Sequence, residues 1–189
     1  MTGADDTRDL TNLIRRAQRG DERAADELFR SIYPELRRMA RLRLRKHTRN
    51  TLLDTTELVH ESYLRFVSAG RLRVEDRAHF LGYAGKIMRS VIVDAARKSI
   101  AKRRGGASAN VTLNSRIVGK DVDAAAQILE VHDALEVLAQ QDPRLVQVVE
   151  LRYFAGMTEL QIAGSLGIAE RTVRRDWEKA RLLLAEQLS

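Results

Sequence analysis

The chain of 189 residues contains no cysteine, only two prolines and few aromatic residues. Without cysteine it can form neither a disulfide framework nor a thiolate metal site, which fits a reducing cytoplasm. No apolar run approaches the roughly 20 residues that a membrane-spanning helix needs. The N-terminal residues 1–10 are polar and acidic, unlike a signal peptide. We therefore expect a helical, cytoplasmic protein without membrane insertion.

Positive charge is abundant instead, and it is unevenly distributed. The formal net charge is +7, which favours a polyanionic partner. Residues 71–104 hold ten basic and three acidic residues, whereas residues 121–142 hold six acidic residues and no Lys or Arg. The C-terminal segment is basic again. A protein that only coats DNA would have little use for an acidic middle segment.

Residues 157–184 have the pattern of a helix-turn-helix, a motif whose second helix enters the DNA major groove. Thr158 is placed to cap the first helix, and Gly167 suits the left-handed position that ends it. Val173 and Trp177 lie four residues apart and share the inner face of the second helix. The alternative is an ordinary helical hairpin with a solvated basic face. The residues predicted to face outward and bind DNA are Arg171, Thr172, Arg174, Arg175 and Lys179.

Helical periodicity continues through most of the remaining chain, and no strand pattern of any length occurs. The helical stretches are 10–20, 21–46, 55–70, 80–104, 124–138 and 143–154. Asp21 and either Thr55 or Thr56 are expected to cap helices, and Pro34 to mark a kink or a junction. Leu64 is assigned to an apolar helix side. The pattern predicts an all-α fold of two small helical domains, an N-terminal bundle (1–104) and a C-terminal helix-turn-helix domain (124–189), joined by a flexible linker (105–123).

Three stretches together resemble one family. Residues 56–66 (TELVHESYLRF) look like a clamp-binding helix that usually reads acidic-Leu-Val-Gln-Glu-x-Phe. Residues 80–89 (FLGYAGKIMR) are similar to a helix that often reads Phe-x-x-Trp-Leu-x-x-Ile-Ala-x-Asn. With the helix-turn-helix, they resemble the bacterial RNA polymerase sigma factors of the extracytoplasmic-function (ECF) type over nearly the whole chain.

The resemblance implies partners and site residues. The N-terminal domain would bind core RNA polymerase and open the −10 promoter element, and the C-terminal domain would read the −35 element; an anti-sigma factor is a further candidate partner. The acidic segment would then either line a basic path in the polymerase or shield the DNA-binding faces in the free protein. The implied polymerase contacts are Glu57, His60, Glu61 and Arg65. The implied −10 contacts are Arg71, Arg73, Arg77, His79, Tyr83, Lys86, Arg89, Arg97 and Lys98.

The chain departs from the family pattern in ways that affect promoter preference. His60 replaces the usual Gln, the −10 helix has no Trp, and Asp176-Trp177 replaces a common Ser-Arg-Leu run. A helix-turn-helix regulator that is not a sigma factor is the alternative, but its usual β/α sensor domain has no counterpart here. An enzyme is not expected, because the four histidines lack metal-ligand spacing and no glycine-rich phosphate loop occurs. We predict no catalytic residues, metal or cofactor.

Overall fold

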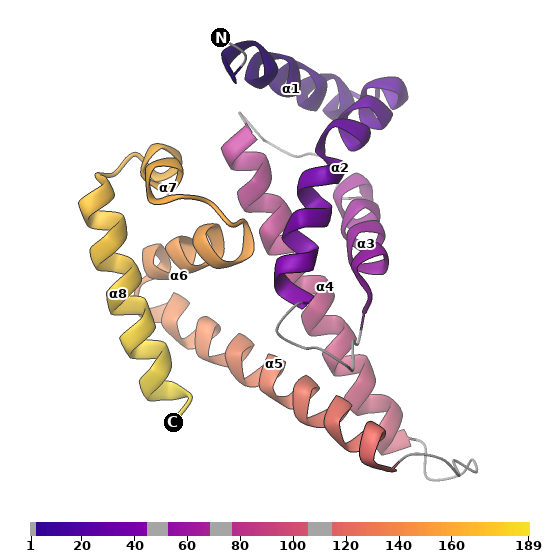
Figure 1. The fold of residues 1–189 in the computed structure, drawn as a ribbon, viewed down its shortest axis with the longest axis vertical. Coiled ribbons are helices and arrows are strands. Elements are labelled where there is room, and N and C mark those ends of the chain that lie inside the picture. The colour runs from indigo at the N-terminus through magenta and orange to yellow at the C-terminus, as the bar shows by residue number, and fades with distance from the viewer. Residues whose placement is uncertain (1–2, 45–52, 69–76, 106–114) are drawn as a thin grey trace.

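The computed structural model describes residues 3–44, 53–68, 77–105 and 115–189. Within these ranges the chain is helical and contains no strand, so the predicted all-α fold is confirmed. Figure 1 shows the arrangement. The elements are α1 (Gly3–Gln18), α2 (Glu22–Leu44), α3 (Thr55–Ser68), α4 (Arg77–Gly105), α5 (Ser115–Gln141), α6 (Pro143–Val149), the π-helical turn η1 (Glu150–Phe154), α7 (Glu159–Leu166) and α8 (Glu170–Gln187).

Aspartates begin several of these helices. Asp21 accepts the N–H of Ala24 at 3.0 Å, as predicted. At α3 the cap is Asp54, which accepts the N–H of Glu57 at 2.8 Å, so the predicted threonine cap is wrong: the threonines already lie in the first turn, and the carboxylate before them reaches the free N–H groups. Pro34 lies inside α2, which continues to Leu44.

The larger hydrophobic core joins the N-terminal helices to the C-terminal part of the chain. Leu28, Met39, Leu58 and Met88 are fully buried in it. The same cluster continues through buried side chains from η1, α7 and α8: Leu151, Ile162, Ala163 and Val173. A second, smaller cluster lies within the C-terminal part and consists of Leu135, Leu138, Leu145, Val146, Val149, Phe154 and Ala180.

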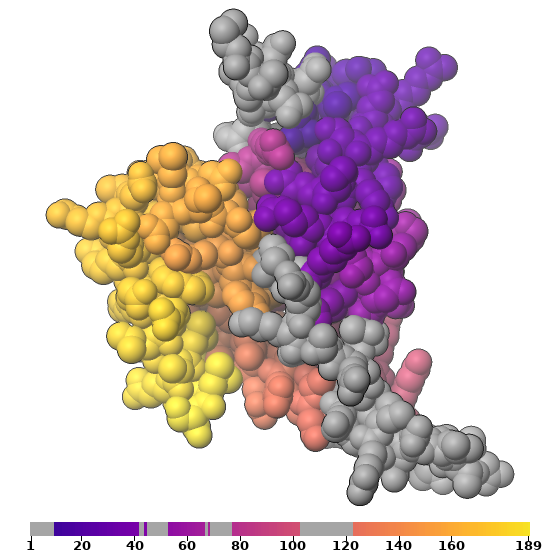
Figure 2. Space-filling view, viewed as in Figure 1, coloured from indigo at the N-terminus to yellow at the C-terminus, as the bar shows by residue number. Residues whose placement is uncertain are grey.

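Helix α4 lies at the centre of the molecule. It contacts α2 and α3 on one side and α5, η1 and α7 on the other. Figure 2 shows α7 and α8 on one side of the molecule and α2 and α3 on the other. Helix α5 begins at Ser115, inside the range predicted as linker, while residues 106–114 lie outside the described part of the chain. The division into two domains stays a prediction. No described helix combines the length and apolarity needed to cross a membrane.

Candidate nucleic-acid interface

Helices α7 and α8 form the predicted helix-turn-helix. Thr158 accepts the N–H of Gln161, whose side chain in turn accepts the N–H of Thr158, which makes a reciprocal capping box. Gly167 has φ 65°, a left-handed conformation that residues with a Cβ rarely adopt, and it ends α7 as predicted. Ile162 and Val173 are fully buried between the two helices. Local sequence signals therefore suffice to place α8 relative to α7.

The outer face of α8 carries the residues predicted to bind the −35 element. Arg171, Arg174, Arg175 and Lys179 are exposed, and Thr172 is half-buried. Each of three of them has a carboxylate neighbour: Arg174 lies 3.0 Å from Glu159, Arg175 lies 3.3 Å from the buried Asp176, and Lys179 lies 3.7 Å from Asp142. The guanidinium groups of Arg174 and Arg175 nevertheless stay more than 60% exposed and open to solvent.

Glu159 connects the two helices of the motif. Its carboxylate accepts from Arg152 at 2.7 Å and from Arg174 at 3.0 Å. The hydrogen bond from Arg152, and then that from Arg174, holds the pKa of Glu159 below its ordinary value, because both favour the charged form. Arg152 also lies over the ring of Trp177, 4.9 Å from its centroid. Glu159 thus holds Arg174, a predicted DNA contact, near the start of α7.

Asp176 is a positioning residue that the sequence reading missed. Its side chain is buried, although it lies on the helix predicted to face DNA, and it accepts from Arg144 Nε at 2.7 Å. This hydrogen bond ties α8 to α6. The sequence signal for this role is the departure from the family pattern at Asp176-Trp177.

The predicted −10 residues of α4 do not share one face. Arg77 donates to Glu35 on α2. Tyr83 is half-buried, and its ring lies edge-on to that of Phe66 on α3. The others divide between exposed positions and the face toward the C-terminal part, and two lie outside the described residues. His79, Arg97 and Lys98 are exposed, Lys86 and Arg89 face the C-terminal part, and Arg71 and Arg73 lie outside the described residues.

Arg89 is bound by acidic residues of the C-terminal part. Its guanidinium donates to Glu150 at 2.8 Å and to Glu136 at 2.8 Å. It also lies 2.7 Å from Nδ1 of His132, which must accept because a guanidinium can only donate. Lys86 lies 3.6 Å from the same Glu150, which is itself buried. Two predicted DNA contacts therefore already bind carboxylates.

Two glycines let this face of α4 approach the C-terminal part closely. A Cβ on Gly85 would lie 3.2 Å from the backbone nitrogen of Ala155, and one on Gly82 would lie 2.7 Å from the side chain of Leu151. Gly82, Gly85, Lys86 and Arg89 follow the i, i+3, i+4, i+7 spacing that places residues on one side of a helix. The contact between α4 and η1 thus combines a close backbone approach with ion pairs from Lys86 and Arg89 to Glu150.

The predicted polymerase-binding residues lie on α3. Glu57 and His60 are exposed and Glu61 is half-buried. Leu64 shares their side of the helix and is 61% exposed, so its assignment to an apolar side is wrong: positions 57, 60, 61 and 64 form one outward stripe.

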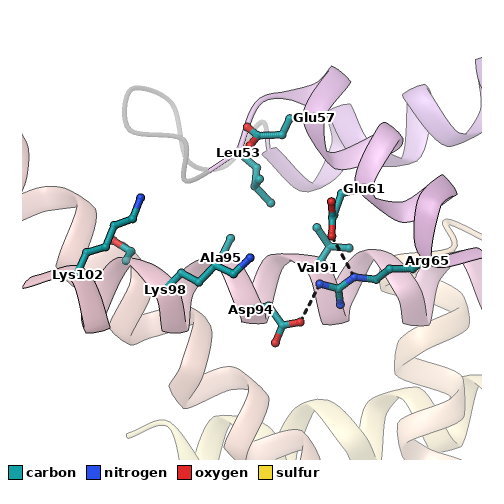
Figure 3. Close-up of a pocket in the computed structure, with 10 residues that line it drawn as sticks. Leu53, Glu57, Glu61, Arg65, Val91, Asp94, Ala95, Lys98 and Lys102 are labelled. Atoms are coloured by element: carbon teal, nitrogen blue, oxygen red, sulfur yellow. Dashed lines mark hydrogen bonds and ion pairs between the residues drawn. The ribbon is translucent and has the colours of Figure 1, made fainter. Parts of the chain in front are cut away.

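A groove of about 320 Å³ separates this part of α3 from α4 (Figure 3). Arg65 bridges it, with contacts of 2.8 Å to Asp94 and 3.5 Å to Glu61, and donates to Ser90 Oγ at 2.7 Å. Lys98 and Lys102 line the α4 side. Arg65 is therefore held within the protein, whereas Glu57 and His60 remain open to a partner.

The described residues form an all-helical fold that includes a helix-turn-helix with an open basic face, a feature of the class of DNA-binding proteins. The family model described as ECF sigma factor matches residues 7–189. The chain belongs to the ECF sigma factor family. Its role is in transcription initiation, with core RNA polymerase and promoter DNA as partners, and the family is not one of known enzymes. No curated protein matches the chain significantly.

Proposed function

We propose that this sigma factor selects promoters through two separate surfaces, α8 at the −35 element and α4 at the −10 element, while α3 binds the polymerase. The observation that carries the proposal is the open basic face of α8 in a helix-turn-helix whose first helix begins with a capping box. A run of exposed arginines at the start of the second helix matches the part of that helix that meets base edges in this motif.

At the −35 element, Arg171, Arg174 and Arg175 supply the cationic face. An arginine that takes guanine O6 and N7 in a bidentate pair contributes about 1–3 kcal/mol of discrimination. Arg174 and Arg175 are both more than 60% exposed. This exposure of both guanidinium groups supports a role in binding.

At the −10 element, α4 would supply the charge that holds the separated strand. Extruding a base costs a few kcal/mol by unstacking, and cationic and aromatic contacts offset this cost. Helix α4 is rich in buried apolar residues, and it also carries basic residues along its length, among them Lys86, Arg89 and Arg97. Their placement supports backbone contacts, which do not depend on sequence.

Polymerase binding would use the outward stripe of α3. Glu57, His60, Glu61 and Leu64 combine negative charge with an exposed apolar side chain. The acidic groups suit a basic partner surface, and Leu64 would lose its exposure to water on contact. We infer that Leu64 contributes affinity, at about 25 cal/mol for each Å² of apolar surface removed from water.

Run-off transcription with core polymerase tests the proposal. On genomic DNA of the source bacterium, the chain should direct initiation at a defined set of promoters whose mapped upstream sequences share −10 and −35 elements. Arg174→Ala with Arg175→Ala should reduce transcription from promoters that depend on the −35 element by about tenfold or more, because two base or phosphate contacts are lost. Binding to core polymerase should not change.

The matched control is Arg23→Ala with Arg30→Ala, which removes the same charge from exposed positions of α2. This variant should initiate like the unaltered chain. If the chain adds no promoter-specific initiation and only blocks or stimulates a complete holoenzyme, the sigma mechanism fails and a conventional regulator is the better description. If the α8 variant instead loses core binding, the assignment of α8 to DNA fails.

A further inference from the structure

Two neighbouring arginines on the outer face of α8, Arg174 and Arg175, are each held by a carboxylate in the same pattern of hydrogen bonds. We propose that these carboxylates, Glu159 and Asp176, are positioning residues that hold the two arginines so that each reads a guanine of the −35 element. The inference rests on the proposed function, because it takes α8 to bind this element. It goes further by assigning base reading to particular residues of the helix and by naming what orients them.

Glu159 holds Arg174 by one edge of its guanidinium group. Nε and Nη2 of Arg174 donate to the same carboxylate oxygen, Oε2, at 3.2 Å and 3.0 Å. The other oxygen, Oε1, accepts from Nη1 of Arg152 at 2.7 Å. Arg152 is itself placed against the ring of Trp177. The carboxylate is therefore fixed by a second arginine, which belongs to η1 and not to α8.

Asp176 holds Arg175 in the same way. Nε and Nη2 of Arg175 donate to Oδ1 at 3.4 Å and 3.3 Å, while Oδ2 accepts from Nε of Arg144 on α6 at 2.7 Å. The side chain of Asp176 is 2% exposed and that of Arg175 is 69% exposed. A buried carboxylate, fixed by a residue of another helix, thus restricts a guanidinium group that projects into solvent.

This pattern leaves the outer edge of each guanidinium group available to a ligand. The carboxylate takes the N–H of Nε and one N–H of Nη2, so the N–H groups of Nη1 and the second N–H of Nη2 remain. Two parallel donors at this edge match O6 and N7 of guanine. A side chain whose plane is already fixed also loses less conformational freedom on binding, which favours a contact that depends on geometry.

Charge favours bases over phosphates as the ligands of these two arginines. A carboxylate next to an arginine offsets part of its charge and weakens its attraction to a phosphate. Guanine O6 and N7 belong to a neutral base and require aligned donors more than net charge. Lys179 on the same helix provides the contrast, because its ammonium group has no planar edge and lies 3.7 Å from the nearest carboxylate, Asp142. Lys179 therefore suits a phosphate.

A barcoded promoter library tests the base reading. Each position of the −35 element of one mapped promoter is varied singly, the library is transcribed by the holoenzyme, and the barcodes are counted in the RNA. Arg174→Ala and Arg175→Ala should each abolish a preference for guanine at one position. Glu159→Gln should weaken the preference that depends on Arg174 severalfold. Asp176→Asn should do the same to the preference that depends on Arg175.

Affinity for DNA without a −35 element provides a readout that a purely structural role would not give. The free chain is titrated against a fluorescein-labelled duplex that lacks this element, and anisotropy is followed at fixed ionic strength. Glu159→Gln and Asp176→Asn should bind this duplex at least as tightly as the unaltered chain, because each removes a negative charge near the phosphates. The matched control Glu178→Gln removes the same charge from an exposed pair with Arg181 on α8, and it should leave every base preference unchanged.

A double variant tests whether Asp176 acts through Arg175. In an Arg175→Ala background, Asp176→Asn should leave the remaining base preferences unchanged. If Asp176→Asn instead weakens all positions equally and lowers affinity for the duplex without a −35 element, Asp176 only supports the fold of α8 and its positioning role is overturned. If circular dichroism shows that Asp176→Asn does not fold, Glu159→Gln decides, since the Glu159 side chain is 23% exposed.

The same library separates this inference from the proposed function. If both arginine variants lose a guanine preference while Glu159→Gln and Asp176→Asn keep both preferences, positioning by the carboxylates is overturned and the proposed function stands. If neither arginine variant changes a base preference, base reading by these arginines is overturned. If transcription by the unaltered holoenzyme does not depend on the −35 element at all, the proposed function fails first.

Discussion

Arg89 on α4 and Arg175 on α8 are both arginines predicted to bind promoter DNA, yet their side chains are 11% and 69% exposed. Arg89 binds two carboxylates from α5 and η1, whereas Arg175 contacts only Asp176 on its own helix. Neighbouring elements cover the one arginine, and the other is open to solvent in the conformation observed.

The difference in exposure between the two arginines follows from how their helices pack against the rest of the protein. On α8 the inner residues Val173 and Ala180 are buried and the arginines point outward, so one side of the helix supplies the core and the other stays open. Helix α4 is central and packs on both sides, and Arg89 shares a covered face with Gly82 and Gly85, whereas Arg97 and Lys98 lie at exposed positions of the same helix. The exposure of a basic residue on α4 therefore depends on which neighbouring element covers its position.

The prediction with the largest expected effect tests whether α4 and the C-terminal part of the chain share one hydrophobic core. Ile162→Ala removes a fully buried side chain of α7 from the cluster that also contains residues of α2 and α4. It should lower the free energy of unfolding by about 2–5 kcal/mol. Because the core is shared, urea unfolding followed by the fluorescence of Trp177 and by far-UV circular dichroism should shift together.

Leu160→Ala on the same helix is the control, since Leu160 is 67% exposed and should change stability by no more than about 0.5 kcal/mol. Separate transitions for the two probes in the unaltered chain, with only the fluorescence transition moved by Ile162→Ala, would mean that α4 and the C-terminal part unfold independently. The comparison between covered and open faces would then lose its basis.

The prediction with the next largest effect compares Arg89 and Lys86, two basic residues of α4 that were both predicted to contact the −10 element. Arg89→Ala leaves Glu150 buried with a single, longer contact to Lys86 and should cost about 1.5–3 kcal/mol, the range for hydrogen bonds to charged groups. Lys86→Ala should cost no more than about 1 kcal/mol, because Lys86 is largely exposed. Chemical denaturation at neutral pH measures both.

Arg97→Ala is the matched arginine control on the same helix. Its pair with Asp94 spans 3.8 Å between exposed groups, so its loss should be barely measurable. Equal costs for Arg89→Ala and Arg97→Ala would show that the covered arginine contributes no more to the folded state than an open one.

The sequence was sufficient where structure depends on neighbours along the chain. Thr158, Gly167 and Asp21 act as caps or turn residues as their local patterns predict. The apolar positions Ile162 and Val173 are buried as the helical spacing requires. These features depend on a few adjacent residues, and the same physics applies in any fold.

The sequence was insufficient where a partner lies far along the chain. Nothing in the pattern of α4 distinguishes Arg89 from Arg97, because the carboxylates that cover Arg89 lie more than 40 residues away, on α5 and η1. Leu64 was assigned to an apolar side because leucine is usually buried, but α4 covers a different side of α3. The local clue is the pair Gly82 and Gly85, since glycine in a helix interior costs about 1 kcal/mol relative to alanine and a close approach of a neighbour is one reason for its presence.

The prediction with the smallest expected effect concerns the exposed face of α8 and follows from the pKa of Glu159. Because its pKa is lowered in the folded state, Glu159 contributes stability at pH values above the ordinary range of a glutamate. That contribution is lost as the pH falls from this range through the lowered pKa. Thermal unfolding of the unaltered chain and of Glu159→Gln should therefore differ at neutral pH and converge in acid. In an Arg174→Ala background the neutral-pH difference should shrink, because one of the two hydrogen bonds that favour the charged form is gone. A difference that stays constant with pH would mean that Glu159 acts on α8 through its shape and not through its charge.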